Sequence, residues 1–166
     1  MRIRFLGTGT SHGVPVLGCS CAVCRSSDPR DARYRSSVLV EGDGGEIILV
    51  DAGPEFRLQA LRAGLARLDA VLVTHAHADH VHGLDDVRPL TRGKPLPVYA
   101  SPHDVDEIRR RFSYAFGHGQ EGGGKPRLEL VAAEASMTIG AVRVDAVPLM
   151  HGERSILGYQ IGRAHV

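Results

Sequence analysis

The residues best suited to chemistry are three histidines and an aspartate within residues 75–80, in the run Thr74-His75-Ala76-His77-Ala78-Asp79-His80. This run follows an apolar segment, so a strand ending in a tight turn could aim His75 and His77 to one side and place Asp79 and His80 near a neighbouring point. Two-metal hydrolases hold their ions about 3.5–4 Å apart, activate a water and bind both the attacking and the leaving oxygen. The spacing predicts a dinuclear metal site with Asp79 and His80 as catalytic candidates. The alternative is a polar helix start with surface histidines.

A fourth histidine, His151, follows a strand-like pattern over residues 142–149. We expect it to complete the first metal site with His75 and His77, because three neutral imidazoles and a water form a common catalytic zinc arrangement. A surface histidine is the alternative. Asp51 ends another strand-like run and is a candidate to fix the ring of a ligating histidine by a hydrogen bond, or else a strand-end turn former.

The remaining histidines are weaker candidates. His12 lies in a glycine turn and could face the site, whereas His82 is expected to point away from it. His118 lies in a glycine-rich segment and is interpreted as an exposed loop residue, and His103 and His165 carry no expected role.

All three cysteines lie in the run Cys19-Ser20-Cys21-Ala22-Val23-Cys24. Their odd number and close spacing do not suit a disulfide framework of a secreted protein. Three thiolates at this spacing favour one structural zinc, which is normally four-coordinate. The fourth ligand is not evident, and reduced thiols without a metal are the alternative.

The surrounding pattern predicts an α/β fold that places these residues together. The runs 47–50 and 70–73 are nearly continuous in apolar residues and flank a helical segment, 54–63, so we expect parallel neighbouring strands with helices over one face. Ligand sites of such sheets lie beyond the carboxyl ends of the strands, which brings Asp51 beside His75. The other expected strands are 2–6, 36–41, 97–100, 127–132, 136–139 and 142–149, the other helices are 81–90 and 102–112, and the expected loops are 7–13, 14–35 and 114–126.

The whole chain has 166 residues, and we expect a single domain over residues 1–166. Twenty basic and nineteen acidic residues, without a run of like charge, do not indicate a long nucleic-acid partner or an anionic membrane. No stretch approaches the roughly 20 apolar residues of a membrane span, and the N-terminus has no signal-peptide pattern. We therefore expect a cytoplasmic location.

The run 74–80 resembles the HxHxDH motif of the metallo-β-lactamase fold superfamily. The segments Gly7-Thr8-Gly9-Thr10-Ser11, Gly18 to Cys24, Val50 to Pro54 and Gly83 to Arg88 look more narrowly like the PhnP-type cyclic phosphodiesterases. The resemblance implies an αββα sandwich, and two zinc or manganese ions at the catalytic site. It places His75, His77 and His151 on one ion and Asp79 and His80 on the other. It also implies a structural zinc on Cys19, Cys21 and Cys24, a homodimer, and as substrate a small phosphodiester, namely a five-membered cyclic phosphate of a ribose phosphate.

The same resemblance implies further ligands beyond the end of this chain: an aspartate bridging both metals, a histidine on the second metal and a histidine closing the cysteine site. After His151 the chain offers only Glu153 and His165. We therefore expect a fold whose C-terminal portion is missing, with an open sheet edge and an apolar face that favour self-association. The leading functional hypothesis is a metal-dependent phosphodiesterase. The alternatives are thioester or amide hydrolysis on the same metal core and a metal-binding fragment without catalysis, while processing of transfer RNA is disfavoured by the near-neutral charge.

Overall fold

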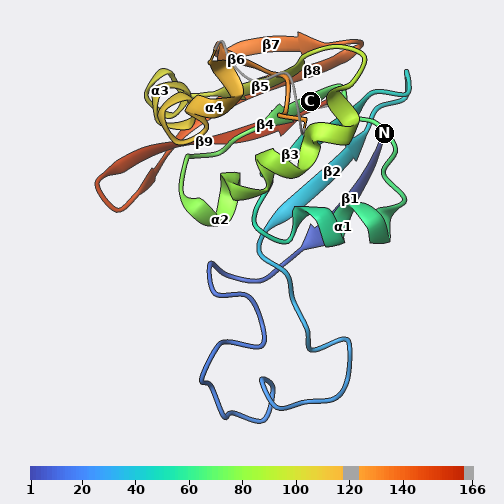
Figure 1. The fold of residues 1–166 in the computed structure, drawn as a ribbon, viewed down its shortest axis with the longest axis vertical. Helices are drawn as coiled ribbons and strands as arrows, with labels where there is room; N and C mark the ends of the chain where they lie inside the picture. Colours follow the sequence, from blue (N-terminus) through green and yellow to red (C-terminus); the bar gives the residue numbers. More distant parts are fainter. Residues whose placement is uncertain (118–123, 163–166) are drawn as a thin grey trace.

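The computed structural model describes residues 1–117 and 124–162 and is built on a six-stranded sheet (Figure 1). The first three strands pair in antiparallel fashion and the last four in parallel, so the expected parallel pairing of 47–50 with 70–73 is confirmed. The strands follow one another across the sheet as β1 (Arg2–Gly7), β2 (Ser37–Glu41), β3 (Ile47–Val50), β4 (Ala70–Leu72), β5 (Leu96–Ala100) and β6 (Leu128–Ala132).

Helices cover one face of this sheet. Gly64, in the left-handed region at φ 67°, ends the first helix, and Ser101 caps the helix after β5 by accepting a hydrogen bond from the Asp104 N–H. The helices are α1 (Phe56–Ala63), α2 (Ala78–Val81), the 3₁₀ helix η1 (His82–Thr91), α3 (Pro102–Arg111) and α4 (Ser113–Phe116). Within residues 1–117 and 124–162, we find no helix with both the length and the apolar character needed to cross a membrane.

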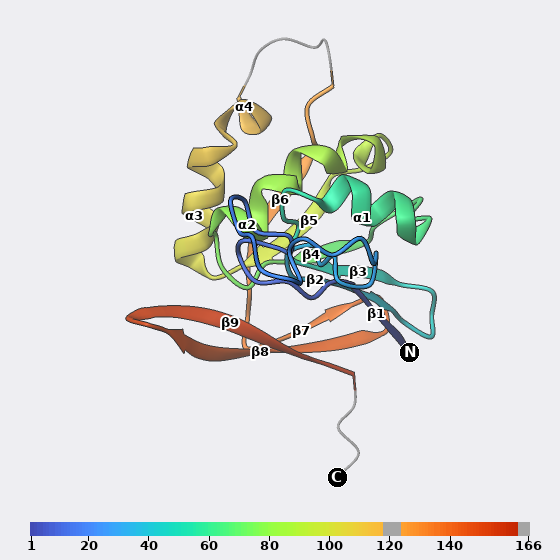
Figure 2. The same ribbon diagram turned by 90° about the horizontal axis from the view of Figure 1, so that it is seen from below.

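A second, three-stranded sheet covers the opposite face; it consists of β7 (Ser136–Ile139), β8 (Val142–His151) and β9 (Arg154–Ile161). Side chains alternate between the two faces of the larger sheet, so Leu49 and Val71 pack against the helices while Ile48 and Leu72 pack against the second sheet. Burial on both faces explains why β3 and β4 are apolar at every position. Figure 2 shows the resulting order of helices, large sheet and small sheet, which is three consecutive layers of the expected αββα sandwich.

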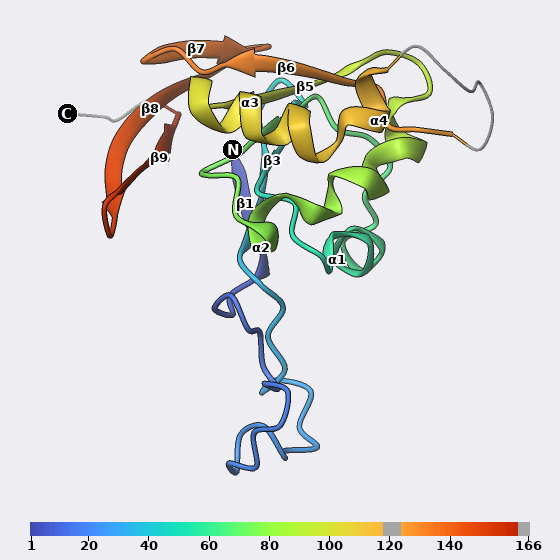
Figure 3. The ribbon, with the colours of Figure 1, turned by 60° about the vertical axis from the view of Figure 1, so that its left-hand side comes forward.

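The connection between β1 and β2 projects away from these layers (Figure 3). Two isolated bridges, Gly9 with Arg35 and Val14 with Arg33, hold its two arms together near the base. The loop expected over residues 14–35 is therefore confirmed, and the cysteines lie in its outer part.

Several sequence-based expectations were wrong. Instead of the α-helix expected over 81–90, α2 ends at Val81 and the 3₁₀ helix η1 follows, in which Pro89 has no N–H to donate. The start of the expected loop 114–126 forms α4, and residues 118–123 lie outside the described residues. Strand β9 was not expected at all. Since it pairs with β8 up to the hairpin, His151 is the last residue of β8 rather than a residue beyond the strand.

Candidate metal centre

Imidazoles from both sheets converge at one point. His75 and His77 lie in the segment between β4 and α2, and His151 ends β8 in the small sheet. The ring centroids of His75 and His77 are 4.5 Å apart, and that of His151 lies 5.5 Å and 5.7 Å from them. One nitrogen from each ring lies within 4.8 Å of the others. The structure thus brings together the three histidines that the sequence predicts as one ligand set.

The geometry and protonation of these rings fit a divalent cation. Two nitrogens bound tetrahedrally at about 2.0–2.1 Å lie about 3.4 Å apart, and His75 Nε2 is 3.0 Å from His77 Nδ1. His75 is only 5% exposed, and burial, followed by the nearby charges of His80 and His77, lowers its pKa to about 4. A ring that stays neutral at pH 7 offers a free lone pair, which is the form that binds a metal.

Asp79 and His80 form a second cluster beside the first. His80 Nε2 lies 3.3 Å from Asp79 Oδ2, and the rings of His80 and His75 are 4.2 Å apart between centroids. Burial lowers the pKa of His80, but its hydrogen bond to Asp51 and the charges of Asp51 and Asp79 outweigh that effect and raise it overall. Asp79 and His80 alone can supply only part of the coordination shell of a second metal ion.

Asp51 holds the second cluster in place. Its carboxylate is 3% exposed, and Oδ2 accepts a hydrogen bond from His80 Nδ1 at 2.6 Å and from the Thr74 hydroxyl at 2.8 Å. Oδ1 accepts from the Thr74 N–H at 2.8 Å. The structure therefore shows the hydrogen bond expected between Asp51 and a ring of the motif, with His80 as its donor. Thr74 was missed as a functional residue, although its position between the strand and the first histidine was a usable signal.

Two glycines let the chain after β3 approach α2 closely. The Ala52 N–H donates to the His80 carbonyl and the Gly83 N–H donates to the Ala52 carbonyl, both at 2.8 Å. A Cβ atom at Gly53 would lie 2.3 Å from the Asp79 carbonyl oxygen, and one at Gly83 would lie 2.2 Å from the Gly53 carbonyl oxygen. No other residue type fits these positions without displacing the backbone that carries Asp79 and His80.

The candidate ligands line a pocket of about 370 Å³. Three hydroxyl-bearing residues that the sequence analysis missed, Thr10, Ser11 and Ser36, line it from the base of the projecting loop, and Ile156 lines it from β9. The Ser36 hydroxyl donates to the Gly9 carbonyl, which fixes that wall. These hydroxyls are candidates to contact a substrate.

The weaker histidine candidates lie apart from this pocket. His82 points toward Phe112, with 6.5 Å between ring centroids, and neither His12 nor His103 lines the pocket. His118 and His165 lie outside the described residues.

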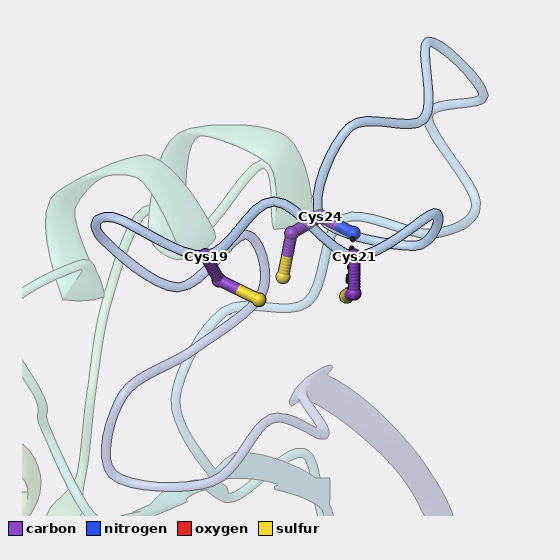
Figure 4. A group of neighbouring side chains, drawn as sticks. All are labelled: Cys19, Cys21 and Cys24. Carbon is purple, nitrogen blue, oxygen red and sulfur yellow. Dashed lines mark hydrogen bonds between the residues drawn. The ribbon is translucent and has the colours of Figure 1, made fainter.

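The three cysteines gather at the outer end of the projecting loop. Their sulfur atoms lie within 4.8 Å of one another, and Figure 4 shows Cys19 and Cys24 turned toward each other with Cys21 beside them. The Cys24 N–H donates to Cys21 Sγ at 3.5 Å, and this bond is the main reason why the pKa of Cys21 falls to about 7. Such a thiol is readily deprotonated for metal binding, so the cluster offers three of the four ligands of a structural zinc.

Comparisons with known proteins identify the family. The model of the beta-lactamase superfamily domain matches residues 46–166. An octanoyltransferase of Porphyromonas gingivalis is 47% identical over 164 residues, which cover 98% of this chain and 33% of that protein. A structure described as a new diphosphatase from the PhnP family matches with a TM-score of 0.85 and 42% identity over 96% of this chain and 62% of the other.

Zinc-bound PqqB from Methylobacterium extorquens shares the fold, with a TM-score of 0.70 and 23% identity over 96% of this chain and 58% of the other. The chain thus spans between one third and about three fifths of the length of these relatives. The expected fold class and the resemblance to the PhnP family are confirmed, and the chain belongs to the beta-lactamase superfamily domain family.

Proposed function

We propose that this chain carries the metal centre of a metal-dependent hydrolase that acts on small phosphodiesters. The observation that carries the proposal is the convergence of His75, His77 and His151, whose ligand atoms lie within 4.8 Å of one another although they come from two different sheets. Three neutral imidazoles that converge in this way match a common catalytic zinc arrangement, in which a water or substrate takes the fourth position.

Each residue of the site has a role that follows from its position. His75, His77 and His151 hold a first zinc or manganese ion, and Asp79 and His80 hold a second. Asp51 fixes the ring of His80 through the 2.6 Å hydrogen bond at Nδ1, which leaves Nε2 directed toward Asp79. The ions, when bound, polarise a phosphoryl oxygen and activate a water.

Two of the hydroxyls that line the pocket bind the phosphate group. Thr10, Ser11 and Ser36 lie on the wall next to the histidines. Thr10 and Ser11 can donate hydrogen bonds to phosphoryl oxygens, whereas the Ser36 hydroxyl already donates to the Gly9 carbonyl and supports the wall. A pocket of about 370 Å³ suits a small ester, and the nearly balanced charge of the chain disfavours a long nucleic acid. A cyclic phosphate of a ribose phosphate is the leading substrate class.

Two other substrate classes are supported by specific relatives. A phosphoanhydride is the second candidate, because the similar PhnP-family structure is described as a diphosphatase. An acyl thioester is the third, because the P. gingivalis relative is named an octanoyltransferase and a metal that polarises a phosphoryl oxygen also polarises a carbonyl. The match covers only one third of that relative, so the relative's name is weaker support for a substrate of this chain.

A substrate panel with metal analysis tests the proposal. The purified chain, loaded with zinc or manganese, is assayed on a cyclic ribose phosphodiester, a dinucleoside diphosphate and octanoyl coenzyme A. We expect turnover of the phosphodiester, and His77→Ala should lower both the activity and the bound metal. His103→Ala, which changes an exposed histidine outside the pocket, is the matched control. A fully metal-loaded chain that cleaves none of the three would instead support a metal-binding protein without catalysis.

A further inference from the structure

Strand β9 is fastened to the segment that carries His75 and His77. The Leu157 N–H donates to the Thr74 carbonyl at 2.9 Å, and the Tyr159 hydroxyl donates to the Val73 carbonyl at 2.8 Å. Both acceptors directly precede His75. The small sheet is therefore bonded to the two residues that follow β4, where the metal motif begins.

An ion pair with a buried carboxylate continues this connection at the first residue of β9. Arg154 pairs directly opposite His151 across the β8–β9 hairpin. Its Nη2 donates to Asp104 Oδ1 at 2.5 Å and to Glu107 Oε2 at 2.9 Å, both on α3. Asp104 is 1% exposed. The helical layer therefore holds the hairpin at the position of His151.

Asp104 also reaches the other pair of imidazoles. The same Oδ1 that accepts from Arg154 accepts from the Ala76 N–H at 3.0 Å, and Ala76 stands between His75 and His77. The Ser101 hydroxyl donates to Asp104 Oδ2 at 2.6 Å and fixes the orientation of the carboxylate. One buried oxygen thus connects the His151 hairpin with the backbone of the histidine segment.

We propose that Arg154 and Asp104 are positioning residues of the metal centre, and that their ion pair sets the distance of His151 from His75 and His77. The inference rests on the proposed function, because it takes the three imidazoles as the ligands of one ion. Neither residue touches the ion or the substrate. A directional, charge-assisted bond to a buried carboxylate resists bending of the two-residue hairpin turn, whereas the main-chain hydrogen bonds of the hairpin alone would allow that bending.

The same carboxylates do not form a further cation site. Asp104 and Glu107, together with His103, lie close enough to hold a metal ion by distance alone. The guanidinium of Arg154 already contacts both carboxylates and supplies the positive charge that a metal would supply. We therefore assign the two carboxylates, and not His103, to positioning.

Three variants and a control separate positioning from stability. Arg154→Met removes the guanidinium, Asp104→Asn removes the charge of its partner, and the double variant removes both. Arg111→Ala is the matched control, since the ion pair of Arg111 with Glu107 stays within α3. Zinc affinity is measured by competition with a chromophoric chelator, ligand geometry by the absorption of the cobalt-substituted protein, and stability by melting of the metal-free protein. His77→Ala gives the baseline for zinc held by the cysteines.

We expect each single variant to melt at a lower temperature and to bind zinc at the histidine site at least about tenfold more weakly, the lower end of what loss of a supporting contact costs a metal site. The double variant has no uncompensated buried charge and should recover part of its stability, yet keep the weakened affinity and the altered cobalt spectrum. Recovery of wild-type affinity in the double variant, or equal weakening in Arg111→Ala, would overturn the inference. Wild-type zinc binding no greater than the His77→Ala baseline would overturn the metal centre itself, a separate result.

Discussion

At the scale of single residues, Asp51 gathers three hydrogen bonds on one side chain. One buried carboxylate accepts from the Thr74 N–H, the Thr74 hydroxyl and His80 Nδ1. Asp51→Asn keeps the size but turns one acceptor into a donor, which cannot accept from the ring or the hydroxyl. We expect the affinity for the second metal ion to fall about 10–100-fold, as when a ligand loses its orienting partner. A manganese titration followed by calorimetry measures this change.

Asp106→Asn is the control for this prediction, because it makes the same chemical change on the exposed side of α3. An unchanged second affinity in Asp51→Asn would show that the hydrogen bond to His80 does not orient a ligand.

A pH dependence follows from Asp104. Burial raises its pKa, but hydrogen bonds and the charge of Arg154 outweigh burial, so the folded state has a lowered pKa. The stabilisation is therefore present above the unfolded pKa near 3.9 and is lost as the pH falls through the lower folded pKa. Urea unfolding between pH 7 and pH 3 should show a smaller acid loss in Asp104→Asn than in the wild type. The groups that face Asp104 are the Ser101 hydroxyl, the Ala76 N–H, Arg154, Glu107 and His103.

A steeper acid loss in Asp104→Asn than in the wild type would contradict the lowered pKa. Asp106→Asn, again the matched change at an exposed position, should follow the wild-type profile.

At the scale of elements, the close contact between the turn after β3 and α2 makes Gly53 sensitive. In Gly53→Ala the new Cβ would meet the Asp79 carbonyl at 2.3 Å, so one of the two backbones must shift. We expect a loss of about 1–3 kcal/mol in the free energy of unfolding, typical of overpacking. Chemical denaturation measures it, and metal affinity should fall as well because Asp79 moves.

Gly93→Ala is the control, since a Cβ there meets nothing within 4 Å. If both alanine variants unfold alike, the close approach seen at Gly53 has no energetic consequence.

The projecting loop between β1 and β2 depends on its own fastening. A loop of this length without helices or strands needs a local constraint, and the three sulfur atoms within 4.8 Å of one another provide it when they bind zinc. Cys21→Ser should lower the melting temperature by at least about 4 °C, corresponding to about 1 kcal/mol or more in a protein of this size. Ser20→Ala, the neighbouring exposed position, is the control. Equal melting temperatures of the wild type with and without a chelator would contradict a structural zinc.

The elements that the sequence predicts well are those with a strong local pattern. β3 and β4 are apolar at every position because both faces are buried, and the cap Ser101 and the stop Gly64 have local causes. β9 was missed because its strand pattern is interrupted by Gly158 and its residues are half-buried, so its pairing with β8 is the deciding interaction. Local patterns carry no information about such pairing.

In the candidate site, too, the sequence predicts the residues with a local pattern and misses the long-range contacts. His75, His77, Asp79 and His80 are visible in one run, and strand-end position alone points to Asp51. The ion pair of Arg154 with Asp104 joins residues 50 positions apart on different layers, and nothing in either local segment indicates it. Long-range polar contacts of this kind need the fold before they can be recognised.

At the scale of the whole molecule, an ion bound by the three histidines would link two layers of the sandwich. His75 and His77 follow a strand of the large sheet, whereas His151 belongs to the small sheet, so an ion bound by all three connects the sheets directly. A ligand that binds only the folded state adds about 2.7 kcal/mol of stability at 100 times its dissociation constant. Zinc bound at the histidine site should therefore contribute a rise of about 5–11 °C to the melting temperature of the wild type under that condition.

The effect of substituting a metal ligand depends on the layer of the sandwich from which the ligand comes. His151→Ala removes the link to the small sheet. The rise in melting temperature on adding zinc should therefore shrink to the part contributed by the cysteine cluster. Adding Cys21→Ser to this variant should remove that remaining part. His103→Ala, an exposed histidine outside the pocket, should keep the full rise. Calorimetric scans at several zinc concentrations measure each contribution. A full rise in His151→Ala would mean that zinc does not join the two sheets, because the ion would then be held by the large sheet and the projecting loop alone.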